Sequence, residues 1–151
     1  MRLLVVGAGG VGGYFGGRLA RAGVPVTVLA RGPHLEAIRR HGLRVRSATD
    51  GEWVAKVDAL ADVTGQAPFD TVLFCVKSFD TATAAAAIRP ALAPGAAVVS
   101  LQNGVDNEET LDAVLGPGHA VGGAAYVFAA IEAPGLIVHR LGGRLVLGEL
   151  D

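Results

Sequence analysis

The stretch that decides the fold spans residues 3–31 and reads LLVVGAGGVGGYFGGRLARAGVPVTVLAR. Residues 2–6, RLLVV, predict a short buried strand. Residues 10–22 predict a helix that Gly23 ends, because glycine readily adopts the left-handed conformation found after helix C-termini. The β-branched run at residues 25–30 predicts a second strand. This strand–helix–strand order predicts a βαβ unit with parallel strands.

Three glycines, Gly7, Gly9 and Gly12, form the pattern G-x-G-x-x-G between the first strand and the helix. In dinucleotide-binding proteins the first glycine permits a tight turn, the second lets the backbone approach a pyrophosphate, and the third lets helix and strand pack closely. The helix N-terminus adds free N–H groups and a partial positive charge. We therefore predict a dinucleotide-binding loop formed by Gly7, Ala8, Gly9, Gly10, Val11 and Gly12. The alternative is a glycine-rich turn that binds no ligand.

The predicted helix contains further glycines at Gly13, Gly16 and Gly17. A glycine in a helix interior costs about 1 kcal/mol relative to alanine. We expect close packing of this helix against another element to compensate for that cost.

Arg31 follows the second strand, at the position where NAD-binding proteins carry a carboxylate for the ribose 2′-hydroxyl. No Asp or Glu precedes Glu36. A guanidinium suits a 2′-phosphate instead, because it can donate two charge-assisted hydrogen bonds to it. The sequence therefore favours NADP(H) over NAD(H), with a solvated surface arginine as the alternative interpretation.

The remaining chain continues the alternation of strands and helices. We predict helices over residues 33–41, 79–89 and 106–115, and strands over residues 43–47, 53–57, 71–76 and 96–101. Asp106 and Glu109 predict a capping box at the start of the last helix. Three strand-like pieces, joined by APG and GG turns, predict an antiparallel finish over residues 122–131, 136–141 and 144–150. The fold class is therefore α/β, with a Rossmann-type, doubly wound, mostly parallel sheet in one dinucleotide-binding domain over residues 1–151.

Two polar side chains follow buried strands of this predicted sheet. Lys77 comes after the apolar run at residues 71–76, and Asn103 follows the run at residues 96–101 within an Asn-Gly turn. The carboxyl ends of parallel strands form one edge of a sheet, where ligands bind, so we expect both side chains beside the glycine loop. The alternatives are a charge that only ends a strand, for Lys77, and a turn-forming residue, for Asn103.

The chain has 151 residues, 51% of them hydrophobic, and a formal net charge of −1. This composition fits one domain with a substantial core and argues against a basic nucleic-acid-binding surface. No apolar stretch approaches the roughly 20 residues that span a membrane.

The single cysteine, Cys75, lies in an apolar run, which favours a core position in a cytoplasmic protein. The four histidines show no metal-ligand spacing, so we expect structural or exposed positions for them and no metal site.

Four motifs together resemble one protein family. In chain order they are GAGGVGG, LAR, CVKSFD and LQNGVDNEE, and they resemble the amino-terminal domain of ketopantoate reductases (2-dehydropantoate 2-reductases). The segment GGAAYVFAAIEAPGLIVH is also similar, so the resemblance covers nearly the whole chain. Many dehydrogenases share the glycine motif, whereas the strand-end lysine followed by Q-N-G-x-x-x-x-E is more specific.

The resemblance implies the reduction of 2-dehydropantoate to pantoate with NADPH, on the route to pantothenate and coenzyme A. It implies that the glycine loop holds the pyrophosphate and that Arg31 and Lys77 face the 2′-phosphate and the adenosine ribose. It also implies that Asn103 lies near the nicotinamide ribose and the small 2-oxo acid substrate. In this family the proton donor is a lysine of a second, helical domain. A glutamate of that second domain also contributes to the active site.

No catalytic residue of that kind can be assigned in this chain. Its lysines are Lys77 and Lys56, and Lys56 belongs to a predicted strand far from the expected edge. We therefore interpret residues 1–151 as the amino-terminal part of a longer two-domain enzyme, inactive alone, which needs a helical second domain or a dimer partner. The open alternatives are a reductase of another 2-oxo acid or ketone, and a stand-alone NADP-sensing module without catalysis.

Overall fold

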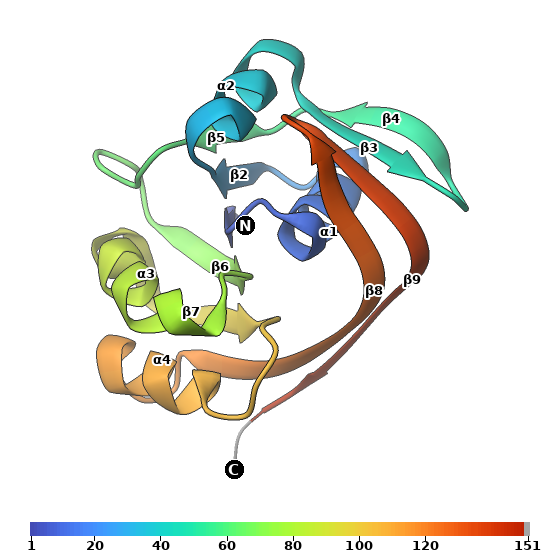
Figure 1. Ribbon diagram of the computed structural model, residues 1–151. Helices are drawn as coiled ribbons and strands as arrows, with labels where there is room; N and C mark the ends of the chain where they lie inside the picture. Colours follow the sequence, from blue (N-terminus) through green and yellow to red (C-terminus); the bar gives the residue numbers. More distant parts are fainter. Residues whose placement is uncertain (150–151) are drawn as a thin grey trace.

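One mixed sheet organises the structure. The computed structural model describes residues 1–149, within which nine strands pair in the order β4-β3-β9-β8-β7-β6-β1-β2-β5. Figure 1 shows helices on both faces of this sheet, which confirms the predicted doubly wound α/β fold. Leu150, in the last predicted strand, lies outside the described residues. In chain order the elements are β1 (Leu3–Val6), α1 (Gly10–Arg21), β2 (Val26–Leu29), α2 (Gly32–His41), β3 (Leu43–Ser47), β4 (Gly51–Ala55), β5 (Asp58–Leu60), β6 (Phe69–Phe74), η1 (Ser78–Asp80), α3 (Thr81–Ile88), η2 (Arg89–Ala91), β7 (Leu92–Ser100), α4 (Asn107–Leu115), β8 (Ala120–Ala133) and β9 (Leu136–Gly148).

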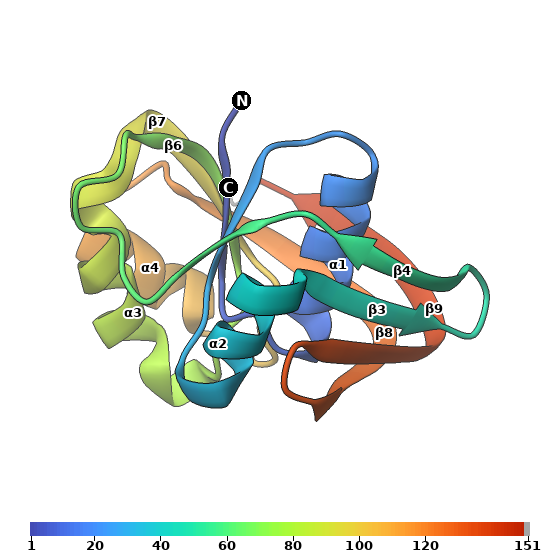
Figure 2. The same ribbon diagram turned by 90° about the horizontal axis from the view of Figure 1, so that it is seen from above.

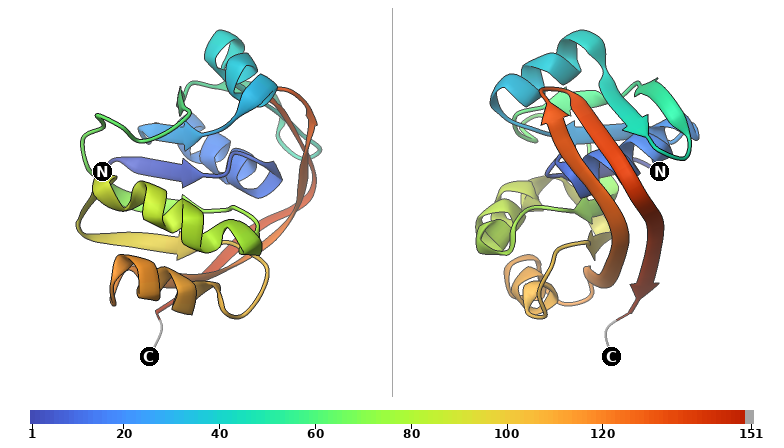
Figure 3. Two further views of the ribbon diagram at one scale, coloured as in Figure 1. Left: turned by 60° about the vertical axis from the view of Figure 1, so that its left-hand side comes forward. Right: turned by 45° about the vertical axis from the view of Figure 1, so that its right-hand side comes forward.

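The strands around β1 are parallel. β1 pairs with β2 on one side and with β6 on the other, and β7 and β8 continue the parallel set beyond β6. Alternate residues of β1 face opposite ways: Leu3 and Val5 belong to the core that includes α1 and α2, and Leu4 and Val6 to the core that includes α3 and α4. Figure 3 shows α3 and α4 side by side on their face. Because helices cover both faces, the strand is apolar throughout.

The sheet curls around α1. β8 and β9 are long and bent, and they lead to the β3–β4 hairpin beside the helix, as Figure 2 shows from above. A Cβ built on Gly16 would lie 3.0 Å from Val5 of β1, and one on Gly13 would lie 2.7 Å from Ile137 of β9. Gly17 faces β3 in the same way. The predicted close packing of the glycine-bearing helix is confirmed, and it occurs on two sides at once.

The hairpin of β8 and β9 contains a bulge that the sequence did not predict. Its turn lies at the predicted APG segment, where Gly135 has a φ of +75°. The turn predicted at Gly142 and Gly143 was wrong, because both glycines lie within β9. At this point the pairing register between β8 and β9 shifts, next to Tyr126. Their positive φ values bend the strand instead of reversing it. A Cβ on Gly143 would lie 2.9 Å from the Tyr14 hydroxyl, so glycine lets β9 pass over α1.

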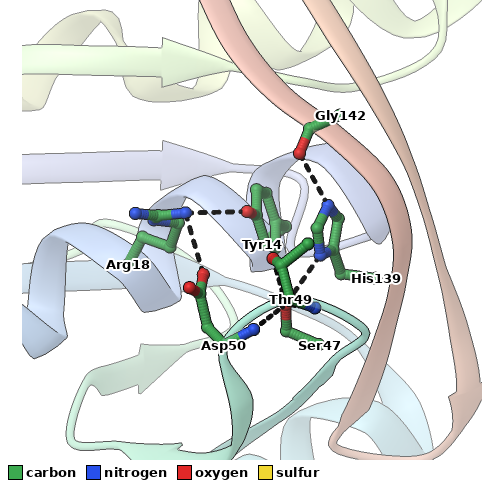
Figure 4. Close-up of polar contacts among 7 residues, drawn as sticks. All are labelled: Tyr14, Arg18, Ser47, Thr49, Asp50, His139 and Gly142. Atoms are coloured by element: carbon green, nitrogen blue, oxygen red, sulfur yellow. Dashed lines mark hydrogen bonds and ion pairs between the residues drawn. The ribbon is translucent and has the colours of Figure 1, made fainter.

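Beneath the bulge, a buried histidine joins β9 to α1 and β3. His139 stacks on Tyr14 with their ring centroids 4.2 Å apart. The Gly142 carbonyl can only accept, so His139 Nε2 carries the proton and donates to it at 2.9 Å, while Nδ1 accepts from the Ser47 hydroxyl at 2.8 Å. Figure 4 shows these contacts. His139 is therefore a structural residue, as expected from the sequence.

The same cluster includes an ion pair at the surface. Arg18 donates to the Tyr14 hydroxyl at 3.0 Å and to the Asp50 carboxylate at 3.1 Å. Asp50 lies in the turn of the β3–β4 hairpin, and its backbone N–H donates to Ser47 Oγ at 3.1 Å. These contacts tie the hairpin to the solvent side of α1 (Figure 4).

Several local predictions differ from the structure. β6 ends at Phe74, so Cys75 and Val76 lie beyond the strand, and β5 is an edge strand that the sequence did not predict. The capping box was wrong: Asp106 occupies the N-cap of α4 without a side-chain hydrogen bond. Its φ of −109° and ψ of 3° are not the extended conformation that directs a capping side chain toward the first turn.

Within residues 1–149, none of the helices is long and apolar enough to cross a membrane.

The packing of α1 can be tested with two glycine substitutions. We expect Gly12→Ala to lower the free energy of unfolding by about 2 kcal/mol or more, the usual scale of overpacking. The added Cβ would overlap the Gly7 carbonyl oxygen and lie 2.9 Å from Val5 Cγ1. Gly9→Ala is the matched control, since a Cβ there meets nothing within 4 Å, and it should cost less than about 1 kcal/mol. Urea unfolding measures both, and equal losses would contradict the packing argument.

Candidate functional site

The glycine loop connects β1 to α1 at the carboxyl edge of the sheet. Gly7 has a φ of +93°, which confirms the predicted tight turn, and Gly12 packs against Val5 of β1 as predicted. Gly9 is the N-cap of α1, and its side is open. The first turn of α1 therefore has no capping side chain and is open at Gly9, while Gly10 packs against the backbone of Ala129 in β8. An uncapped, open helix N-terminus is the arrangement that binds phosphate.

His34 holds the outer side of this loop. Its Nδ1 accepts the backbone N–H of Gly135 at 2.9 Å, so Nε2 carries the proton and donates to the Ala8 carbonyl at 2.6 Å. The Ala8 N–H in turn donates to the Leu29 carbonyl of β2 at 3.3 Å. One half-buried side chain thus connects the glycine loop to the β8–β9 turn. The sequence carried no signal for this contact, because it depends on where that distant turn lies.

The three predicted strand-end residues lie at one edge of the sheet. Arg31 follows β2, Lys77 follows β6, and Asn103 follows β7, and these strands are parallel to β1 and end beside the glycine loop. All three residues are exposed. The structure thus places all three at one edge of the sheet, where the strand order reverses around β1, and their roles there stay predictions.

A pocket of about 300 Å³ lies on the β2 side of the glycine loop. Gly7 and Arg31 form part of its wall, and Asp80 of η1 contributes a carboxylate that the sequence analysis did not single out. The other lining residues are mainly apolar and include Leu29, Ala61, Ala84, Ala87 and Ile88. An apolar slot beside a guanidinium can take a flat aromatic base whose sugar carries a phosphate.

A second pocket, of about 350 Å³, lies on the β7–β8 side of the loop. Val11 of α1, Asn103 and Gln102 line it together with Gly123 and Tyr126 of β8. Among the described residues that line it, Tyr126 is the one titratable side chain. The two pockets flank the glycine loop, so the site has the layout that a ligand with two halves and a central phosphate group needs.

The cysteine, Lys56 and His119 line neither pocket. Burial raises the pKa of the half-buried Cys75 thiol to about 12, which disfavours the nucleophilic thiolate near neutral pH. Lys56 follows β4 at the edge of the sheet and lines neither pocket. His119 donates from Nδ1 to the Ala96 carbonyl at 2.7 Å, a structural contact.

Comparisons with known proteins agree with this geometry. A family model described as "Ketopantoate reductase PanE/ApbA" matches residues 3–151. The chain belongs to the ketopantoate reductase family. A 2-dehydropantoate 2-reductase of Pyrococcus abyssi is 35% identical over 148 residues, which cover 98% of this chain and 47% of that protein. The resemblance predicted from the sequence motifs is therefore confirmed.

The solved structures lead to the same family. A PanE/ApbA family ketopantoate reductase from Ralstonia eutropha JMP134 is 44% identical and superposes with a TM-score of 0.92, covering 97% of this chain and 49% of that one. An "uncharacterized oxidoreductase YkpB" of Bacillus subtilis is 33% identical over 99% of this chain and 49% of its own length. The chain spans about half the length of the curated relatives it matches.

The bridging role of His34 gives a test of the loop. We expect His34→Ala to lower the free energy of unfolding by about 2 kcal/mol, because it leaves the Ala8 carbonyl and the Gly135 N–H without their partner. His41→Ala is the matched control at the exposed end of the same helix, and it should stay within about 0.5 kcal/mol. Thermal or urea unfolding distinguishes the two variants. Equal stabilities would show that the bridge contributes nothing.

Proposed function

We propose that this chain is the NADPH-binding domain of a 2-dehydropantoate 2-reductase, which reduces ketopantoate to pantoate. The observation that carries the proposal is the pair of pockets on either side of an open, uncapped helix N-terminus, with Arg31 in the wall of one of them. The family and the names of its relatives support the reaction. The nicotinamide cofactor supplies a hydride for the substrate ketone when it is bound.

The residues of the first pocket fit the adenosine half of NADPH. Arg31 is exposed, and no acidic residue precedes Glu36, so the chain offers a cation to a 2′-phosphate at the end of the second strand. The carboxylate in this wall belongs to Asp80 of η1, which follows β6. The apolar wall, which includes Ala84 and Ile88 of α3, suits the adenine face. Lys77, on the loop that leads to this wall, is proposed to add a second cation for the ribose phosphate.

The pyrophosphate is proposed to bind at the glycine loop. The N–H groups of the first turn of α1 have no partner within the helix, and Gly9 lets a ligand approach them closely. Gly7, Ala8, Gly10, Val11 and Gly12 complete the loop around this point.

The second pocket is proposed to hold the nicotinamide ribose and the substrate. Asn103 can donate and accept hydrogen bonds there, which suits ribose hydroxyls and a ketone oxygen. The described lining contains no lysine, arginine or histidine to pair with the carboxylate of a 2-oxo acid. We therefore propose that a helical second domain or a second copy supplies that cation and the proton for the alkoxide.

A reductase of another 2-oxo acid or ketone is the second candidate. The neutral lining of the second pocket favours it as an alternative, because the described residues there do not select one substrate. An NADP-sensing module without catalysis would use the same first pocket.

Cofactor preference tests the assignment of Arg31. We expect residues 1–151 to bind NADPH more tightly than NADH, and Arg31→Ala to weaken NADPH binding roughly tenfold or more through the loss of charge-assisted hydrogen bonds. NADH affinity should change little. Arg40→Ala, at the exposed far end of α2, is the matched control and should leave both affinities unchanged. Calorimetric titration measures them, and an unaltered preference in Arg31→Ala would reject the assignment.

Turnover tests the proposed need for a partner. We expect residues 1–151 to bind NADPH without oxidising it in the presence of ketopantoate, because the second pocket lacks a lysine donor in its described lining. Absorbance of NADPH at saturating substrate reports the rate. Measurable turnover would contradict the expectation, and its loss in Tyr126→Phe would then assign the proton to Tyr126.

A further inference from the structure

Lys77 and Asn103 reach the edge of the sheet on two different loops. The β6–η1 connection carries Lys77, and the β7–α4 connection carries Asn103. β6 and β7 are paired neighbours, with Phe74 opposite Ser100, so the two loops leave the sheet side by side. Loops are more mobile than the strands they connect. Two loops that serve one ligand therefore need a contact that holds them together.

The side chain of Gln102 makes that contact. Its Nε2 donates to the Val76 carbonyl at 2.9 Å and to Thr81 Oγ1 at 2.8 Å, so both amide hydrogens are used. Val76 directly precedes Lys77, and Thr81 begins the helix that follows the loop. Gln102 itself directly precedes Asn103. One half-buried carboxamide thus holds both ends of the Lys77 loop to the backbone beside Asn103.

Further hydrogen bonds close a ring around this contact. The Asn103 carbonyl accepts from Ser78 Oγ at 2.7 Å and from Asn107 Nδ2 at 2.9 Å. Thr81 Oγ1, already bonded to the Gln102 amide, lies 3.3 Å from Asn107 Oδ1. Gly104, with a φ of +114°, would bring a Cβ to 3.2 Å from Asn107 Nδ2, so glycine leaves room for the ring. The ring leaves the side chains of Lys77 and Asn103 exposed at the edge.

We propose that Gln102 is a positioning residue of the cofactor site, which fixes Lys77 relative to Asn103 so that one nucleotide can contact both. The inference rests on the proposed function, because it concerns the same site. The contact requires an amide. A glutamate has the same length but cannot donate when ionised, so Gln102→Glu would set a carboxylate against the Val76 carbonyl. The Lys77 loop would then be loosened, with the hydrogen bond from Ser78 to the Asn103 carbonyl still joining the two loops.

The test compares the effect of Lys77→Ala on NADPH binding in two versions of the 1–151 chain. In the unchanged chain we expect Lys77→Ala to weaken binding roughly tenfold, as for the loss of one hydrogen bond to a charged group. In the Gln102→Glu chain the same substitution should weaken binding less than about threefold, because substitutions at coupled residues are not additive and a loosened loop holds Lys77 less firmly at the nucleotide. Calorimetric titration gives the four dissociation constants.

Two controls keep the result specific. Gln66→Glu makes the same chemical change in the β5–β6 loop, where Gln66 contacts Arg2, and should preserve the full tenfold effect. Gln102→Met, uncharged and similar in length, replaces Gln102→Glu if that variant does not fold, as judged from its thermal unfolding.

The outcomes separate this inference from the proposed function. If Lys77→Ala has the same effect with and without the Gln102 change, or no effect in either chain, the positioning role is overturned even where Gln102→Glu lowers the melting temperature. If the unchanged chain binds no NADPH, the proposed function fails, and this inference fails with it.

Discussion

The packing of α1 between strands on two of its sides is the constraint on which the rest of the structure depends. The glycine positions of the helix bring Val5 of β1 and Ile137 of β9 into contact with its backbone, where a Cβ would collide. Each such glycine costs the helix about 1 kcal/mol relative to alanine. The apolar surface buried as the sheet closes around α1 offsets that cost. The curl of β8 and β9 is thus required by the helix they enclose.

This packing also fixes where the N-terminus of α1 points. With its body held between β1 and β9, the first turn lies at the carboxyl edge, beside the ends of β2, β6 and β7. The glycines of this segment differ in what faces them. Gly13 and Gly16 are closed by protein side chains, whereas Gly9 faces open space. The stacking of His139 on Tyr14 and the His34 bridge hold the returning strands to the helix and loop. Stability and an open ligand approach therefore depend on the same short segment.

Features set by nearby residues could be predicted from the sequence, and features set by distant ones could not. The spacing of glycine and apolar residues was enough for β1, α1 and β2, and strand ends in a parallel sheet meet at one edge regardless of detail. The bulge in β9 brings Gly143 against Tyr14 of α1, and the pairing of β3 with β9 joins segments far apart in the chain. Gln102 lies beside the predicted Asn103, yet its partners Val76 and Thr81 become neighbours only when β6 and β7 align.

The two pockets differ in charge. This difference matters for the proposed reduction, which needs both binding of the reactants and a proton donor. The first combines Arg31 and Asp80 with an apolar wall, and these are the groups that the adenosine half of the proposed cofactor would meet. The second is lined in its described part by amides, glycine and apolar groups, with Tyr126 as its titratable side chain. Amides orient a ketone but do not release a proton near neutral pH, and reduction of a ketone needs one for the forming alkoxide. Under the proposed function, the residues of this chain would hold and align the reactants. The proton would then come from Tyr126 or from a partner domain.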